Sequence, residues 1–477
     1  SGGADNDTLF GGVDNDTLNG DAGADTLNGE SGTDNLNGGT GSDTLNGGTG
    51  NDQLHGDADN DRLSGDAGAD ALWGGANDDF LLGGAGSDLL YGEAGSDTLN
   101  GNTDFDSLNG GAGDDWLVAL DGAVDTLEGG TGRDSFWRDR VGDGIRDFAA
   151  ADDVDNAVTR FANGADLTLD GDAIQRGLVP LLPTRNFSSN PLFASNGPTG
   201  SDVRVTGRAG TTWGAQLAAL ADGADAGVSA PDPSRSWLIR RAMVDFGDGT
   251  YGLKLGDSFY RVDGMLPGNA QGPSYAGFGA QNSIWVNIAM KGIVTALSEE
   301  GAIQPGSLNY GLLTDPGRMG PVTVFDIFGG NQQRAGGTTG GANSPINAMN
   351  LRGALDMFQR GYSYLTVSLA DSGDSNVNQG FWQRGTLGRK FAAFYGIAPA
   401  QPPASTPMVY SVSAVETVNG QVTAVILRNP TGSDTGGSDV AVSYRDANAN
   451  DGLVRITVAE LLTSTKGPRL SWLSTGR

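Results

Sequence analysis

A nine-residue repeat fills the first 136 residues of this 477-residue chain and limits the folds that it can adopt. Units such as GGTGSDTLN, GGTGNDQLH and GGAGSDLLY begin at Gly38, Gly47 and Gly83. Each unit carries an aspartate and, two residues later, an apolar residue that keeps its phase along the array. A disordered spacer has no need of leucine in phase, whereas a glycine-rich nonapeptide with an aspartate is typical of a parallel β-helix. The repeat therefore predicts a parallel β-roll over residues 3–136.

The aspartates of the array are candidate metal ligands. Two nonapeptides make one turn of such a roll, so residues 18 apart stack on one another. Glycines permit positive φ and expose carbonyl oxygens, and each aspartate adds a charged oxygen, a combination that suits Ca²⁺. We expect about a dozen calcium ions in two rows, with interior sites such as Asp43, Asp52 and Asp88 mattering more than Asp7 or Asp134. The ligand candidates are Asp7, Asp16, Asp25, Asp34, Asp43, Asp52, Asp61, Asp70, Asp79, Asp88, Asp97, Asp106, Asp115, Asp125 and Asp134.

The acidity of the chain is concentrated in this array. Residues 1–136 contain 28 Asp plus Glu against two basic residues, a net charge of −26, whereas the remainder carries only −3. Repulsion predicts an array that is unfolded without calcium, and about a dozen divalent ions would nearly neutralise it. This charge argues against nucleic acid as a partner. There is no cysteine, and the longest apolar stretch, residues 283–297, falls short of the ~20 residues of a transmembrane span.

The repeat residues resemble the RTX (repeats-in-toxin) family. The resemblance implies a bacterial protein that is secreted through a one-step, type I channel and folds outside the cell on meeting calcium. We therefore expect an extracellular or cell-surface location. The chain opens inside a repeat without a signal peptide, and we expect either an upstream segment or another subunit to cover the first turn.

Beyond the array the composition becomes that of an ordinary globular domain. Residues 137–199 form a transition, in which the cluster Asp152, Asp153 and Asp155 either holds another cation or, as we favour, belongs to a solvated linker. Alternating and helical patterns then predict hairpins at 241–255 and 257–267, helices at 280–298 and 350–359, and strands at 408–432 and 452–462.

The order of these elements resembles the calpain-like cysteine proteases in their bacterial form, over roughly residues 200–462. The family's nucleophile segment matches TGRAGTTW, Thr206 to Trp213. The stretches DFGDGTYGLKL, YAGFGAQNSIWVNIAMKG and ILRNPTG look like that family's later landmarks. The resemblance implies a mainly β chain with an α+β part: a β-roll over residues 1–136, a two-lobed papain-like domain over 200–465, and a C-terminal tail over 466–477.

The same resemblance implies a protease without its catalytic groups. The nucleophilic cysteine falls on Thr212, the oxyanion-hole glutamine on Thr206 and the catalytic histidine on or near Met408, and only the orienting asparagine survives, as Asn429. The chain has one histidine, His55, inside the array, where we expect it to face solvent. Without a cysteine or a histidine elsewhere, Cys-His, Ser-His-Asp and His-zinc hydrolysis are excluded. We do not expect an enzyme, although a carboxylate-pair glycosidase stays open.

Two functions fit these observations. The first is an extracellular, calcium-dependent structural protein: a subunit of a surface layer, sheath, filament or matrix that associates with itself or with other surface components. The second is a secreted adhesin or binding module, whose degenerate cleft around Trp213 grips a peptide or glycan without cutting it. Filaments or sheets formed on adding calcium would favour the first, and a monomer that captures a soluble ligand the second.

Overall fold

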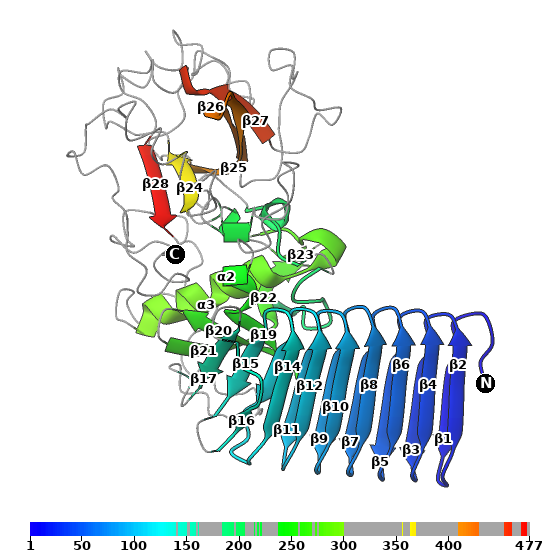
Figure 1. Cartoon of the computed structure of the whole chain (residues 1–477). Helices are drawn as coiled ribbons and strands as arrows, with labels where there is room; N and C mark the ends of the chain where they lie inside the picture. The colour runs from blue at the N-terminus through cyan, green and yellow to red at the C-terminus, as the bar shows by residue number, and fades with distance from the viewer. Residues whose placement is uncertain are drawn as a thin grey trace. The chain divides into compact units, whose positions relative to one another are not determined.

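The chain forms two compact units (Figure 1). The first comprises residues 1–176, 243–254 and 258–263, and the second residues 177–242, 255–257 and 264–477. The described part is mainly β with little helix. The computed structural model describes residues 1–139, 142–149, 153–158, 161, 184–194, 197–205, 214, 217–218, 220–221, 237–255, 258–269, 272–273, 276–299, 355, 363–368, 409–428, 453–459 and 469–474.

The repeat array folds as the predicted parallel β-roll, a solenoid of two sheets (Figure 1). One sheet has nine strands, the odd-numbered ones from β1 to β17; the other has eight, the even-numbered ones from β2 to β16. The odd-numbered sheet consists of β1 (Thr8–Gly12), β3 (Thr26–Ser31), β5 (Thr44–Thr49), β7 (Arg62–Ala67), β9 (Phe80–Ala85), β11 (Thr98–Thr103), β13 (Trp116–Ala119), β15 (Ser135–Arg138) and β17 (Val154–Ala157). The even-numbered sheet consists of β2 (Thr17–Ala22), β4 (Asn35–Thr40), β6 (Gln53–Ala58), β8 (Ala71–Ala76), β10 (Leu89–Ala94), β12 (Ser107–Ala112), β14 (Thr126–Thr131) and β16 (Gly144–Ile145).

The 18-residue stacking predicted from the repeat is confirmed. Leu27 pairs with Leu45 in one sheet, and Leu36 with Leu54 in the other. The leucine of each unit points between the sheets, and those from Leu27 to Leu99 have no exposed surface. Each such side chain contributes about 1.5–3 kcal/mol through burial. The leucines form one column on each sheet, and the two columns together are the core of the roll.

The roll continues beyond residue 136, where we predicted a linker. Strand β16 pairs with β14 and strand β17 pairs with β15, both parallel. The linker interpretation was therefore wrong for Gly144–Ile145 and Val154–Ala157. Asp143 and Ile145 keep the aspartate-x-apolar spacing of the repeat, while Arg138 makes two hydrogen bonds with Asp155, at 3.0 and 2.8 Å. These contacts extend the roll although the glycine pattern has ended.

The first unit also contains a small antiparallel sheet from much further along the chain. Strands β19 (Met243–Asp245), β20 (Thr250–Leu255) and β21 (Ser258–Asp263) pair in that order. The sequence predicted these strands correctly. We grouped them with residues 200–465, however, whereas the compact units place 243–254 and 258–263 with the roll.

The second unit combines short strands and helices. Strand β22 (Met265–Asn269) pairs with β18 (Thr184–Asn186) and β23 (Gly272–Pro273). A five-stranded antiparallel sheet has the order β27-β26-β25-β24-β28. Its strands are β24 (Ser363–Ser368), β25 (Val409–Val418), β26 (Gln421–Arg428), β27 (Leu453–Thr457) and β28 (Arg469–Ser474). The helical segments are η2 (Gly200–Asp202), α2 (Trp237–Arg240), η4 (Ala280–Asn282) and α3 (Trp285–Glu299).

The predicted helix at 280–298 is confirmed by η4 and α3, and the strands predicted in 408–432 by β25 and β26. Of the helix predicted at 350–359, only Leu355 is among the described residues, and it is helical. A two-lobed papain-like arrangement stays a prediction. Within the described ranges no helix has both the length and the apolarity to cross a membrane.

Candidate calcium sites

The repeat aspartates form two rows, one at the start of each sheet's strands. Asp25 directly precedes β3, and Asp34 directly precedes β4. The row before the odd-numbered strands contains Asp7, Asp25, Asp43, Asp61, Asp79, Asp97, Asp115, Asp134 and Asp153. The row before the even-numbered strands contains Asp16, Asp34, Asp52, Asp70, Asp88, Asp106, Asp125 and Asp143.

One carboxylate oxygen of each interior aspartate is held by the backbone. The N–H of Asp43 donates to Oδ1 of Asp61 at 2.8 Å, and the N–H of Asp61 donates to Oδ1 of Asp79 at 2.8 Å. The other row repeats the pattern, with Asp52 donating to Asp70 at 2.7 Å. Each aspartate thus accepts a hydrogen bond from the aspartate one turn earlier, and this bond fixes the direction of its second oxygen.

The second oxygen, Oδ2, is buried in most of these aspartates and accepts no hydrogen bond from the protein. Burying a carboxylate oxygen without a partner is unfavourable. This pattern therefore fits carboxylates that bind a cation better than carboxylates that only stabilise the fold. Asp97, for example, has no exposed surface. Within the described part of the roll, these oxygens belong to Asp25, Asp34, Asp43, Asp52, Asp61, Asp70, Asp79, Asp88, Asp97, Asp115 and Asp143.

Glycine carbonyls lie close to these free oxygens. A Cβ atom built on Gly29 would lie 2.5 Å from Oδ2 of Asp34 and 2.6 Å from the carbonyl oxygen of Gly47. The same Cβ on Gly65 would lie 2.5 Å from Oδ2 of Asp70. A carboxylate oxygen of one turn and a carbonyl oxygen of the next therefore face one small space, which only glycine leaves open.

This donor set fits calcium. Its oxygens are hard ligands, the chain has no cysteine, and calcium accepts mixtures of carboxylate and carbonyl oxygens. No group of three carboxylate or imidazole side chains suitable for a metal occurs among the described residues. The proposed sites agree with that finding, because most of their oxygens belong to the backbone.

Burial raises the pKa of the interior aspartates, and repulsion from neighbouring carboxylates adds to the rise. The pKa reaches about 7 for Asp61, about 8 for Asp79 and Asp97, and about 9 for Asp106 and Asp115. Loss of water around the carboxylate is the largest cause in each case, and the backbone hydrogen bond opposes it. In the folded roll Asp79, Asp97, Asp106 and Asp115 are therefore mostly protonated at neutral pH, and Asp61 partly so, unless a cation replaces the proton.

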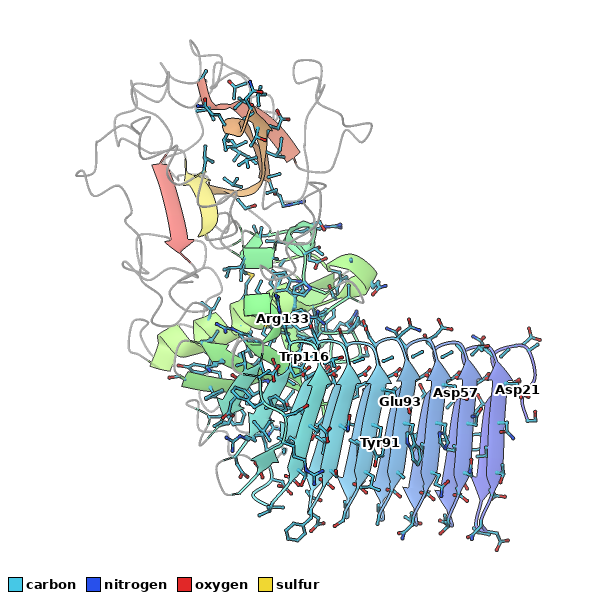
Figure 2. All side chains as sticks on the ribbon, viewed as in Figure 1. Asp21, Asp57, Tyr91, Glu93, Trp116 and Arg133 are labelled. Carbon is cyan, nitrogen blue, oxygen red and sulfur yellow. The ribbon has the colours of Figure 1, made fainter. Side chains whose placement is uncertain are left out.

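A further row of carboxylates lies on the surface of the even-numbered sheet. Asp21, Asp57 and Glu93 are exposed, occupy register positions that alternate with glycines, and have φ of 75°, 72° and 74° (Figure 2). Most repeats place glycine at this left-handed position, since a side chain there is strained. These residues add negative charge to the roll.

A comparison with known families identifies this array. The model of the RTX calcium-binding nonapeptide repeat, in four copies, matches residues 1–36, 28–63, 37–72, 55–90 and 91–124. Residues 1–124 are RTX calcium-binding nonapeptide repeats. RTX repeats bind calcium and are typical of secreted bacterial proteins. No curated protein matches the chain.

The RTX roll contains one candidate ligand that the sequence analysis missed, Asp143, and a second, Asp153, that it named only in the cluster we favoured as a linker. The N–H of Asp125 donates to Oδ1 of Asp143 at 3.2 Å, and the N–H of Asp134 donates to Oδ1 of Asp153 at 3.1 Å. Asp134 is therefore an interior residue, not the end residue that we expected. Asp143 could have been recognised because Ile145 follows it at the repeat spacing. Asp153 had no such signal.

The predicted protease positions are not part of this site. Thr206, Thr212, Met408 and Asn429 all lie outside the described residues, as does Asp152. Leu217, Ala218, Leu220 and Ala221, which follow the predicted nucleophile segment, are helical and buried. The segment after Trp213 is therefore helical where it is described, while the degenerate active site stays a prediction.

His55 lies on the outer face of the even-numbered sheet of the RTX roll, half-buried in a row of stacked rings. Its ring stacks on Trp73 at 4.4 Å between centroids, and Trp73 stacks on Tyr91 at 5.8 Å. Figure 2 shows Tyr91 on this sheet. The three residues occupy one register position on β6, β8 and β10. His55 contributes to this ladder rather than to the metal rows.

Proposed function

We propose that this protein is an extracellular, calcium-dependent structural subunit whose RTX roll holds about a dozen calcium ions in two rows. The carrying observation is the series of buried Oδ2 atoms without hydrogen-bond partners. Each proposed site combines the aspartate of one turn with glycine carbonyls of the adjacent turns. Asp143 and Asp153 belong to this ligand set in addition to the repeat aspartates Asp7 to Asp134.

Bound calcium supplies the positive charge that the aspartate rows lack. The protein orients each Oδ1 through a backbone N–H and leaves each Oδ2 facing a glycine carbonyl. Neutralising the carboxylates removes repulsion along each row, so the roll is stable only when its sites are filled.

We further propose that the filled roll associates with other copies. Neutralising a charge of −26 removes the main repulsion between molecules. The outer face of the even-numbered sheet supports contact, since Leu89 is 44 % exposed beside the ring of Tyr91. Most repeats have threonine or another polar residue at the position of Leu89, so its apolar side chain departs from the pattern.

Light scattering of the full chain against calcium concentration tests this proposal. We expect particle mass to rise as the strand signal of the roll appears, and the rise to weaken in Leu89→Thr, which restores a common repeat residue. A chain that stays monomeric in saturating calcium, with its roll fully folded, would remove the structural function. In that case the secreted adhesin or binding module would be the remaining function. Ordered filaments in the electron microscope would instead exclude the adhesin or binding module as the main role.

We propose, finally, that the chain does not cleave peptide bonds. Its one histidine lies in the roll and it has no cysteine, so the base and thiol nucleophile of a calpain-like protease are both missing, each worth orders of magnitude in rate. Peptide substrates should remain intact with the purified chain, with or without calcium. Cleavage of a peptide substrate by the purified chain that disappears in Thr212→Ala would contradict this proposal.

A further inference from the structure

The outer face of the odd-numbered sheet changes character along the RTX roll. On β3 and β5 its outward positions carry threonine and asparagine, whereas Phe80, Leu82, Trp116, Val118 and Trp137 occupy them further along. Alternation along a strand turns these side chains away from the leucine core. Even so, Val118 and Trp137 have no exposed surface. Another part of the first unit covers them.

The cover is the sheet β19–β21, which we call the clasp. The ring of Phe246 lies edge-on to Trp137 at 6.4 Å and to Phe161 at 6.1 Å. The ring of Phe259 lies edge-on to Trp137 at 5.7 Å. Trp137 belongs to β15 of the roll, so the clasp and the roll share one aromatic cluster.

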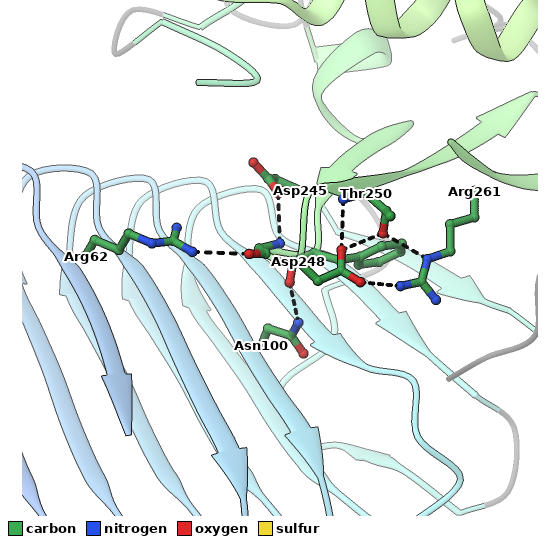
Figure 3. A network of polar contacts seen from close by, with 8 residues as sticks. Arg62, Asn100, Asp245, Asp248, Thr250 and Arg261 are labelled. Atoms are coloured by element: carbon green, nitrogen blue, oxygen red, sulfur yellow. Dashed lines mark hydrogen bonds and ion pairs between the residues drawn. The ribbon is translucent and has the colours of Figure 1, made fainter. Parts of the chain in front are cut away.

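The turn between β19 and β20 contacts the roll through its backbone. Gly247 has φ of 82°, and a Cβ there would lie 2.8 Å from ring and methyl carbons of Phe80 and Leu82. The carbonyl oxygen of Gly247 accepts a hydrogen bond from Arg62 at 3.3 Å (Figure 3). The Arg62 guanidinium itself lies 4.4 Å from the Phe80 ring centroid. Glycine is needed here both for the backbone conformation and for the close approach.

A repeat asparagine holds the next residue of the clasp. Nδ2 of Asn100 donates to the carbonyl oxygen of Phe246 at 2.9 Å, in a buried position (Figure 3). Its Oδ1 accepts from the N–H of Asn102 at 3.0 Å, which orients the amide. At the same repeat position on uncovered strands, Asn46 donates to Asn28 instead. On the covered strand the repeat asparagine Asn100 therefore donates to the clasp and not to the asparagine of a neighbouring strand.

We propose that calcium loading of the RTX roll builds the surface on which the clasp folds, and that the clasp in return stabilises strands β7–β15. Arg62, Phe80, Asn100 and Trp137 come from four different turns, and only stacking of those turns brings them to one face. A three-stranded sheet depends on a packed hydrophobic face for its stability, and the aromatic cluster shared with the roll supplies that packing for the clasp. Because the coupling is thermodynamic, it acts in both directions.

The chain enters the clasp from the second unit and returns to it. Residues 177–242 and 264–477 belong to that unit. Strand β22 begins two residues after β21 ends, and it pairs with β18 of the second unit. The clasp contains none of the repeat aspartates, so its dependence on calcium passes through the roll. This inference does not depend on self-association.

Hydrogen exchange followed by mass spectrometry on the full chain, at dilution where it is monomeric, tests the proposal. In saturating calcium we expect amides of 243–254 to exchange at least tenfold more slowly than in calcium-free buffer. Asn100→Ala should return those amides toward fast exchange while β3 and β5 stay protected. Asn28→Ala, at the same repeat position on an uncovered strand, should leave the clasp unchanged.

Gly247→Ala tests the reverse direction. It should speed exchange at least threefold in β9–β13 but not in β3–β5. Gly420→Ala is its matched control: Gly420 also has positive φ, at 76°, but an added Cβ there meets nothing within 4 Å. Equal protection of the clasp with and without calcium would overturn the proposal, as would an Asn100→Ala protein that is indistinguishable from Asn28→Ala.

Discussion

Full-length protein stripped of calcium is expected to lose the strand signal of residues 8–157 and to regain it in millimolar calcium. In the folded roll, eleven aspartates that accept backbone hydrogen bonds also bury an Oδ2 without a partner. Taking a charged carboxylate out of water without a counter-charge costs several kcal/mol. Nearly every turn carries this desolvation cost, and burial of the narrow leucine core cannot offset it. The unfolded array is then the stable state.

Far-ultraviolet circular dichroism during a calcium titration measures this change. The midpoint should lie at ~10⁻⁴ to 10⁻³ M, the usual range of extracellular calcium modules. Magnesium at the same concentration should not replace calcium, because it demands a smaller octahedral shell and gives up its water reluctantly. Equal strand content in chelator and in calcium would contradict both the sites and the proposed function.

Acid should partly substitute for calcium. The pKa of Asp79 and Asp97 is raised from 3.8 to about 8, and that of Asp115 to about 9, by burial in the folded roll. The folded state therefore binds more protons than the unfolded state between pH 4 and pH 9, so its stability falls as pH rises through that window. Going from pH 7.5 to pH 5 favours the folded, calcium-free roll by up to about 3 kcal/mol for each of these carboxyls.

The experiment uses protein freed of calcium on a chelating resin, since soluble chelators weaken in acid. Strand content at pH 5 should exceed that at pH 7.5, opposite to ordinary acid denaturation. A chain carrying Asp79→Asn, Asp97→Asn and Asp115→Asn together should show more strand at pH 7.5 without calcium and a smaller response to pH. Asp7→Asn is the control, because Asp7 is half-buried at the first turn. Strand content that falls on acidification would refute the assignment of the buried rows.

The roll could be predicted in detail because the period of the repeat specifies which residues of successive turns pair. A period of nine, with an aspartate and an apolar residue in each unit and one inserted residue between Asp115 and Asp125, determines the strand positions, the stacking of alternate strands and the inward-facing columns. The extension to Ala157 was missed because glycines no longer mark its turns, and side-chain contacts such as Arg138 with Asp155 replace them. A period can reveal repeated structure, but not the irregular turns that close it.

For the clasp, the strands could be predicted from the sequence but the surface against which they pack could not. Its strands were predicted from the alternation in 241–267, yet its location was not, because alternation reveals which residues form a strand and not which surface the strand packs against. The apolar substitutions in the array, such as Leu82 and Trp137, were the available signal. Read as departures from the repeat, they mark a covered face. The calpain-like site remains a prediction, since its four positions lie outside the described residues.

The alternation of consecutive strands between two sheets also governs how such a roll can change its length. Strands two apart share a face, so insertion or deletion of eighteen residues between β7 and β15 moves later turns along the axis but leaves every side chain on its sheet. A change of nine residues exchanges the sheets of all later strands, and Arg62 would then lie on the face opposite Trp137. In this stretch the nonapeptide is the unit of sequence, whereas the full turn is the smallest unit by which the gene can grow or shrink while every later strand stays on its sheet.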